Sequence, residues 1–170
     1  MIEFGIKEER YLDNIKNAVD KILLIVTSTL FTLLILATTW QVISRYVLHN
    51  PSTGTEEFVR FGLIWLSMLA AAYAVGTKSH IAISLLSDRL TDGKKTLLDI
   101  FIQCSFLLFA IIIMLYGGIR AVSLTMAQIS PSLNLPMGFV YLALPVSGFL
   151  IIFYSVINVI ALLKAKKIYS

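Results

Sequence analysis

Four long stretches of the chain lack charged side chains. Residues 22–44, 61–77, 100–119 and 121–163 contain no Asp, Glu, Lys or Arg, and the last is long enough for a loop and a span. A bilayer core requires roughly 20 apolar residues in a helix. The second stretch reaches this length when it is extended back through Arg60 and Phe58. The pattern therefore predicts four membrane-spanning helices, at about residues 21–47, 55–76, 96–121 and 136–163.

Two further segments place apolar and polar residues on opposite faces of a helix. In residues 7–20, apolar side chains recur every three or four positions and charged side chains fill the other face. Residues 79–90 repeat this pattern with Ile81, Leu85 and Leu90. Such a pattern is typical of helices that lie along a membrane surface. We therefore expect a single all-α integral membrane domain over residues 1–170, with four spans and two interfacial helices.

Local signals place the ends of the helices. Asn50 and Pro51 end the first span, and Thr53 followed by Glu56 fits a capping box that starts the second. Pro145 predicts a bend in the last span because proline cannot donate a backbone hydrogen bond.

Composition and charge support the membrane assignment. Hydrophobic residues make up 58% of the chain and charged residues 14%, and the mean hydropathy is +0.85. Cytoplasmic loops of membrane proteins are enriched in Lys and Arg, so the basic residues predict that both termini and the middle loop lie in the cytoplasm. The basic residues that share this side are Lys7, Arg10, Lys16, Lys21, Lys78, Arg89, Lys94, Lys95, Lys164, Lys166 and Lys167. This distribution explains the basic pI. We therefore expect membrane lipids as partners and no nucleic acid.

Five charged residues fall at the opposite, outer ends of the spans: Arg45, Glu56, Glu57, Arg60 and Arg120. Glu56 and Arg60 are four residues apart, and Glu57 and Arg60 three, so each pair shares a helix face. Four roles remain open for this charged layer. It can hold the helices together by ion pairing, contact a partner, consist of side chains that only reach toward water, or take part in ion transport.

Small residues line one side of the second span. Ser67, Ala70, Ala71 and Ala74 recur at helical spacing and allow another backbone to approach closely. We interpret these four residues as a subunit docking face, and tight packing inside the chain's own bundle is an equal alternative.

The remaining polar groups of the spans carry no recognisable chemistry. The only cysteine, Cys104, is expected to be a buried packing thiol, and Gln103 and Asn158 are expected to form hydrogen bonds between helices. His49 and His80 are separated by the second span, which excludes a shared haem or metal. The sequence contains no nucleotide-binding, nucleophile or zinc motif. We therefore expect neither an enzyme nor a cofactor or metal site.

An ordered set of residues along nearly the whole chain resembles the small membrane subunit of TRAP transporters, the tripartite ATP-independent periplasmic uptake systems for carboxylates. The set comprises Arg45-Tyr46, Pro51, Glu56-Glu57, Arg60, Trp65, Ala70 to Ala72, His80-Ile81 and "LPMGFVYLALP" at residues 135–145. Two positions depart from the family pattern. Gly54-Thr55 precede the paired acids where the family often has Trp and a small hydroxyl residue, and Ser84 stands where an acid often follows the His-Ile pair.

The resemblance implies a function that the residues alone do not reveal. In such systems a periplasmic binding protein captures the substrate, and a large membrane subunit moves it by a sodium-driven elevator motion. The small subunit braces the static part of the large one in the bacterial inner membrane. The outer loops are expected to contact the binding protein. Sialic acid is the first expected substrate and a C4-dicarboxylate the second. The rival hypothesis is a self-sufficient four-helix, ion-coupled transporter, which normally requires a carboxylate well inside a span.

Overall fold

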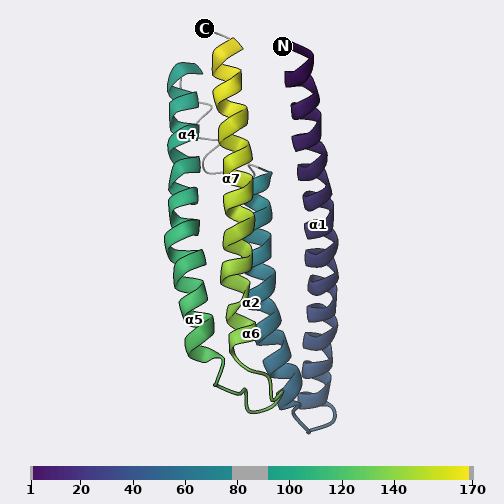
Figure 1. Ribbon diagram of the computed structural model, residues 1–170. Coiled ribbons are helices and arrows are strands. Elements are labelled where there is room, and N and C mark those ends of the chain that lie inside the picture. The colour runs from purple at the N-terminus through teal and green to yellow at the C-terminus, as the bar shows by residue number, and fades with distance from the viewer. Residues whose placement is uncertain (1, 78–91, 169–170) are drawn as a thin grey trace.

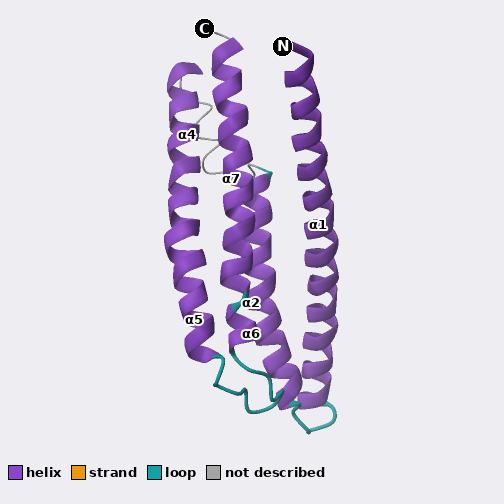
Figure 2. Cartoon of the chain, in the orientation of Figure 1, coloured by secondary structure: helices purple, strands orange, loops and turns teal. Residues whose placement is uncertain are grey.

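Helices make up every regular element that the structure describes (Figure 2). The computed structural model describes residues 2–77 and 92–168, and the side chains of 14–77 and 97–162. The elements are α1 (Ile2–Tyr46), α2 (Thr53–Gly76), α4 (Asp92–Phe109), the π-helix η1 (Ala110–Gly117), α5 (Gly118–Thr125), α6 (Gly138–Tyr141) and α7 (Ala143–Ile168). The predicted all-α class is confirmed for these residues. His80 and the expected interfacial helix at 79–90 lie outside them.

Four helical segments are long and apolar enough to cross a membrane. They cover Asn14–Tyr46, Thr53–Gly76, Leu97–Thr125 and Gly138–Leu162, as the charge-free stretches predict. The start of α1 and the end of α7 lie at one end of the molecule, and the loops at 47–52 and 126–137 lie at the other (Figure 1). That the first of these ends faces the cytoplasm stays a prediction, and we call the loop end the outer end on that basis.

The first span and the segment before it form one continuous helix. Residues 7–20, expected along the membrane surface, and the first apolar stretch both belong to α1. The apolar stripe of the segment continues into the span without a turn residue between them, so nothing in the sequence interrupts the helix.

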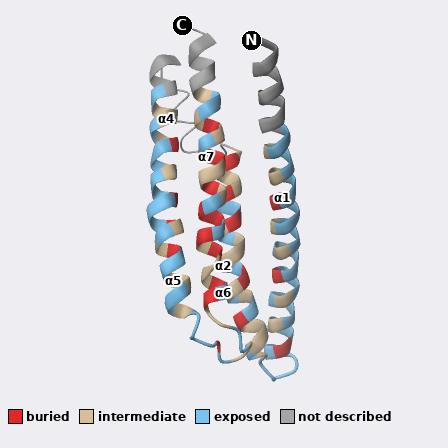
Figure 3. Cartoon of the chain, in the orientation of Figure 1, coloured by how far each residue is buried: buried red, intermediate tan, exposed pale blue. Residues whose placement is uncertain are grey.

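The helices form an open layer in the order α1, α2, α7, α4. Helix α2 packs against α1 on one side and α7 on the other, and α7 in turn packs against α4 and η1. Because α1 and α4 occupy the two edges (Figure 1), most of the described side chains of α1 are exposed, and of those described on α4 only Gln103 is buried. Within the most apolar window of each span, 39% of residues are buried in the last span and 11% in the first. Helix α7 is thus the centre of the layer (Figure 3).

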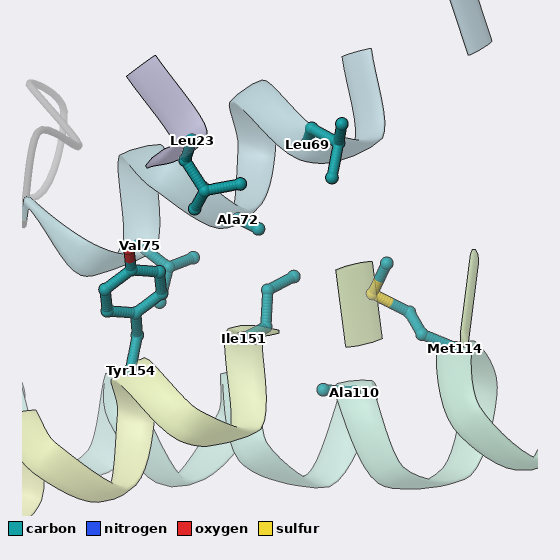
Figure 4. Close-up of a cluster of buried hydrophobic side chains, with 8 residues drawn as sticks. All are labelled: Leu23, Leu69, Ala72, Val75, Ala110, Met114, Ile151 and Tyr154. Carbon is teal, nitrogen blue, oxygen red and sulfur yellow. The ribbon is translucent and has the colours of Figure 1, made fainter. Parts of the chain in front are cut away.

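The core lies where α7 meets its neighbours. It consists of Leu23, Leu69, Ala72, Val75, Ala110, Met114, Ile151 and Tyr154 (Figure 4). Close contact depends on glycine, because small residues let membrane helices approach one another. A Cβ atom added to Gly76 would lie 2.6 Å from the Tyr154 ring, and one added to Gly148 would lie 2.8 Å from the Met114 Cβ. Gly148 thus lies against Met114 of η1, a π-helical segment that the apolar pattern does not predict.

Three local predictions need correction or refinement. The N-cap of α2 is Ser52 and not Thr53, because the Ser52 hydroxyl accepts a bond from the Thr55 amide at 3.4 Å. Cys104 is exposed and not buried, since its neighbour Gln103 takes the position on α4 that faces inward. The last span is interrupted at Leu142, one turn before Pro145, which has no amide hydrogen to offer the Tyr141 carbonyl.

Candidate functional site

Glu56 and Arg60 form a solvent-exposed ion pair on the first turns of α2. The Arg60 Nη2 atom lies 3.5 Å from the Glu56 Oε1 atom, one helical turn away. The Arg60 side chain is 63% exposed and the Glu56 side chain is 45% exposed. Exposed pairs of this kind contribute about 0–1 kcal/mol, so this pair does not hold the fold together.

Glu57 points to a different side of α2 and is buried. One residue along a helix rotates the side chain by about 100°, which turns Glu57 from the exposed face of α2 toward the loop between α5 and α6. Its Oε2 atom accepts hydrogen bonds from the Ser130 hydroxyl at 2.7 Å, the Leu133 amide at 3.0 Å and the Ser132 amide at 3.2 Å. The side chain is 8% exposed. Three donors thus compensate a carboxylate that is shielded from water.

The loop at residues 126–137, the outer loop, is shaped to present those donors. The Ser130 amide donates to the Leu135 carbonyl at 2.9 Å, and the Met137 amide donates to the Gln128 carbonyl at 2.8 Å, closing a bridge between the two sides of the loop. Asn134 has a φ of 52°, a left-handed conformation that asparagine tolerates better than most residues. These bonds close the loop around residues 131–134, and the Ser132 and Leu133 amides donate to Glu57 from within it.

Arg45 and Arg120 remain apart from this arrangement. Arg45 lies in the last turn of α1, where the helix dipole favours a cation, and Arg120 lies in α5. Both side chains are exposed, and neither forms an ion pair with the side chains that the structure describes. The structure therefore brings together only Glu56 and Arg60 of the five predicted outer charges, and it joins Glu57 to the outer loop instead.

The predicted docking face is open. Ser67, Ala70 and Ala71 are exposed and Ala74 is half-buried. They share one face of α2 with the Glu56–Arg60 pair, because all of these residues recur at helical spacing. The opposite face packs against α1 and α7 through the buried residues Gly62, Leu69, Ala72, Val75 and Gly76.

A second set of polar contacts lies at the inner end of the layer. The Tyr154 hydroxyl donates to the Asp20 carboxylate, and the Asn158 amide donates to the Val75 carbonyl at 3.2 Å. Two side chains one turn apart on α7 thus hold α1 and α2. The hydrogen bond expected of Asn158 is confirmed. The buried Gln103 oxygen, by contrast, has no hydrogen-bond partner among the described residues.

The sequence did not single out Ser130, Asp20 or Tyr154. Asp20 fits the polar face of an amphipathic helix, and its position next to the first apolar stretch is the only sign in the sequence of a contact within the bundle. Ser130 lies in a "SPS" turn without a distinguishing motif. Within residues 2–77 and 92–168, no three His, Cys, Asp or Glu side chains are grouped to hold a metal ion.

The chain matches a protein family over most of its length. Residues 34–165 fit the model of the family described as "Tripartite ATP-independent periplasmic transporters, DctQ component". The chain belongs to this DctQ family. It is therefore the small permease component of a TRAP transporter, a transport protein and not an enzyme, and its four candidate spans make it a multi-pass membrane protein. A tripartite system implies a large permease subunit and a periplasmic binding protein as partners.

Relatives of this DctQ-family chain have names that mention different substrates. It is 24% identical over 153 residues to the sialic acid TRAP transporter small permease protein of Vibrio cholerae, covering 90% of this chain and 88% of that protein. It is 34% identical over 99 residues to the C4-dicarboxylate small permease protein of Rhodobacter capsulatus, covering 58% and 44%. It is 34% identical over 116 residues to the isethionate permease protein DctMQ of Oleidesulfovibrio alaskensis, covering 64% of this chain but 18% of that longer protein.

Proposed function

We propose that this chain is a scaffold subunit that braces the large membrane subunit of a TRAP transporter in a bacterial inner membrane. The complex takes up a carboxylate, delivered by a binding protein, with sodium as the driving ion. The arrangement of the helices supports this proposal. An open layer offers broad lateral surfaces to a neighbour, and its buried polar groups Glu57, Tyr154 and Asn158 are engaged in contacts between helices and loops. A brace must not follow the moving part of an elevator, and such contacts keep the helices together.

The charge distribution counts against a self-sufficient transporter. A carrier of that kind normally requires a carboxylate well inside a span. Glu57 lies in the second turn of α2 and is held by the outer loop, and Asp20 lies near the inner end of the first candidate span, bound to Tyr154. Both carboxylates are tied to partners near the membrane boundaries.

The proposed contact with the large subunit is the open face of α2. The docking face formed by Ser67, Ala70, Ala71 and Ala74 lets a helix of the partner approach closely, and Arg60 and Glu56 lie at its outer end. The outer loop is the proposed contact with the binding protein, because it lies at the end of the spans opposite the termini. Sialic acid is the first proposed substrate and a C4-dicarboxylate the second, in keeping with the names of two relatives.

Replacement of Ala71 by Trp tests the docking face. The large ring would hold a partner helix away, so we expect co-purification of the large subunit to fall several-fold. Ala161 is also exposed but lies on α7, and Ala161→Trp is the matched control, which should leave co-purification unchanged. Arg60→Ala should weaken assembly more than it alters sodium affinity. Equal recovery of the large subunit with both Trp variants would place the docking face elsewhere.

Reconstitution tests the function as a whole. Liposomes that contain both membrane subunits should take up substrate only when the binding protein and a sodium gradient are present. Liposomes that contain this chain alone should show no uptake above empty vesicles. Uptake by this chain alone, at a rate comparable with that of the complete system, would disprove the scaffold role.

A further inference from the structure

The hydrogen bonds of Glu57 connect parts of the chain that are distant in sequence. Its three donors come from residues 73 to 76 positions further on. They converge on a single oxygen, so the carboxylate ties the start of the second span to the loop between the third and fourth. The carboxylate of Glu56, its neighbour, accepts a hydrogen bond from Arg60 on the same helix. Two adjacent carboxylates therefore have different structural roles.

The outer loop exposes several of its apolar side chains. Near its bridge the loop exposes Ile129 and Leu135, which are 65% and 46% accessible. Inside its bridge the loop is closed by the Asn134 amide, which donates to the Ser130 carbonyl at 3.2 Å, whereas the Ser132 and Leu133 amides donate to Glu57. Two of the three donors to Glu57 are backbone amides, so the carboxylate constrains the main chain itself and not only a side chain. Without this acceptor, the Ser132 and Leu133 amides would be free to turn toward water.

We propose that Glu57 is a positioning residue that pre-organises the outer loop for contact with the soluble binding protein. This inference rests on the proposed function, in which the outer loop is the surface that the binding protein meets. A surface that is already ordered loses less conformational entropy on binding than a mobile one. Loss of the carboxylate therefore weakens encounter with the binding protein, whereas the transport step inside the large subunit is unaffected.

The experiment compares Glu57→Gln with Glu56→Gln in the assembled complex. Both changes remove one negative charge from the same helical turn, but only the first removes the charged acceptor of the outer loop. Hydrogen–deuterium exchange of the Ser132 and Leu133 amides should accelerate about tenfold in Glu57→Gln, because charged acceptors form stronger hydrogen bonds than neutral ones. Exchange in Glu56→Gln should match the wild type.

Uptake measured at increasing binding-protein concentrations provides the functional readout. Glu57→Gln should raise the half-saturating concentration of binding protein about tenfold and leave the maximal rate within about twofold of the wild type, as expected for lost pre-organisation. Ser130→Ala should produce a smaller shift in the same direction, and little further shift when added to Glu57→Gln, since both act through one contact.

Two results would overturn the inference. Unchanged amide exchange in Glu57→Gln would show that the carboxylate does not fix the loop. Faster exchange with an unchanged half-saturating concentration would show that the loop is not what the binding protein meets. Failure of the wild-type complex to take up substrate would instead reject the proposed function and, with it, the role of the loop toward the binding protein. The exchange measurement would still test the link between Glu57 and the loop.

Discussion

Replacement of Gly76 by Ala tests the closest approach between α2 and α7. The added Cβ atom would lie 2.6, 2.7 and 2.8 Å from three carbons of the Tyr154 ring. The ring has no room to yield, because Tyr154 is fully buried and its hydroxyl is bound to Asp20 on α1. A single methyl group at Gly76 therefore forces α2 and α7 apart, or displaces the ring and breaks its hydrogen bond.

The expected cost follows from these contacts. Overpacking of a filled core costs about 1–3 kcal/mol, and a hydrogen bond to a charged group contributes about 1.5–3 kcal/mol. Alanine recovers up to about 1 kcal/mol through its higher helix propensity. When the ring is displaced both costs apply, so the free energy of unfolding should fall by about 1.5–6 kcal/mol, which lowers the melting temperature of a chain of this size by at least about 3 °C.

Gly117→Ala is the matched control. Gly117 also lies in a helix, but the nearest atom to its added Cβ is the Ile112 carbonyl oxygen at 3.8 Å. Neither glycine has a positive φ, so alanine strains the backbone at neither site. Thermal unfolding of the detergent-solubilised protein, followed by the fluorescence of its two tryptophans, gives the comparison. Equal melting temperatures for the two variants would refute the close packing of Gly76 against Tyr154.

Two further substitutions test the buried polar groups. Tyr154→Phe keeps the ring but leaves the Asp20 carboxylate without its donor, so the free energy of unfolding should fall by about 1–3 kcal/mol; an unchanged melting temperature would show that this bond does not hold α1. Gln103→Leu removes a buried oxygen that has no partner among the described residues, and unfolding measurements should show a neutral or stabilising effect of about 1–2 kcal/mol. A clear loss of stability in Gln103→Leu would mean that this side chain makes a contact that the structure lacks.

The sequence predicts the spans because charge-free length is a property of each segment by itself. It also places Arg60 on the same face as Glu56, since helical spacing decides that within one turn. It does not predict which acid is buried, because Glu56 and Glu57 differ only in the direction in which α2 turns them toward the rest of the molecule. The contacts of Glu57 with Ser130 and of Asp20 with Tyr154 span 73 and 134 residues. They depend on how the helices are ordered in the layer, and no local pattern encodes that order.

The apolar pattern misses the π-helical segment for a related reason. Residues 110–117 are apolar on all sides, so their periodicity does not distinguish one kind of helix from another. The segment lies where Gly148 and Pro145 of α7 press against Met114 and Gly118. This contact joins two spans that the sequence separately identifies but does not pair.

A distance measurement across the layer tests most directly whether this subunit is a static brace. Ser28 and Ser105 are both exposed and belong to α1 and α4, the two edge helices of the layer, and they accept spin labels as cysteines in a Cys104→Ser background. In the complete complex, the distance between the two labels should be the same without sodium, with sodium, and with substrate-loaded binding protein. Labels on the large subunit should report its motion under the same conditions. A second distance that appears between the two labels under transport conditions would contradict the static brace.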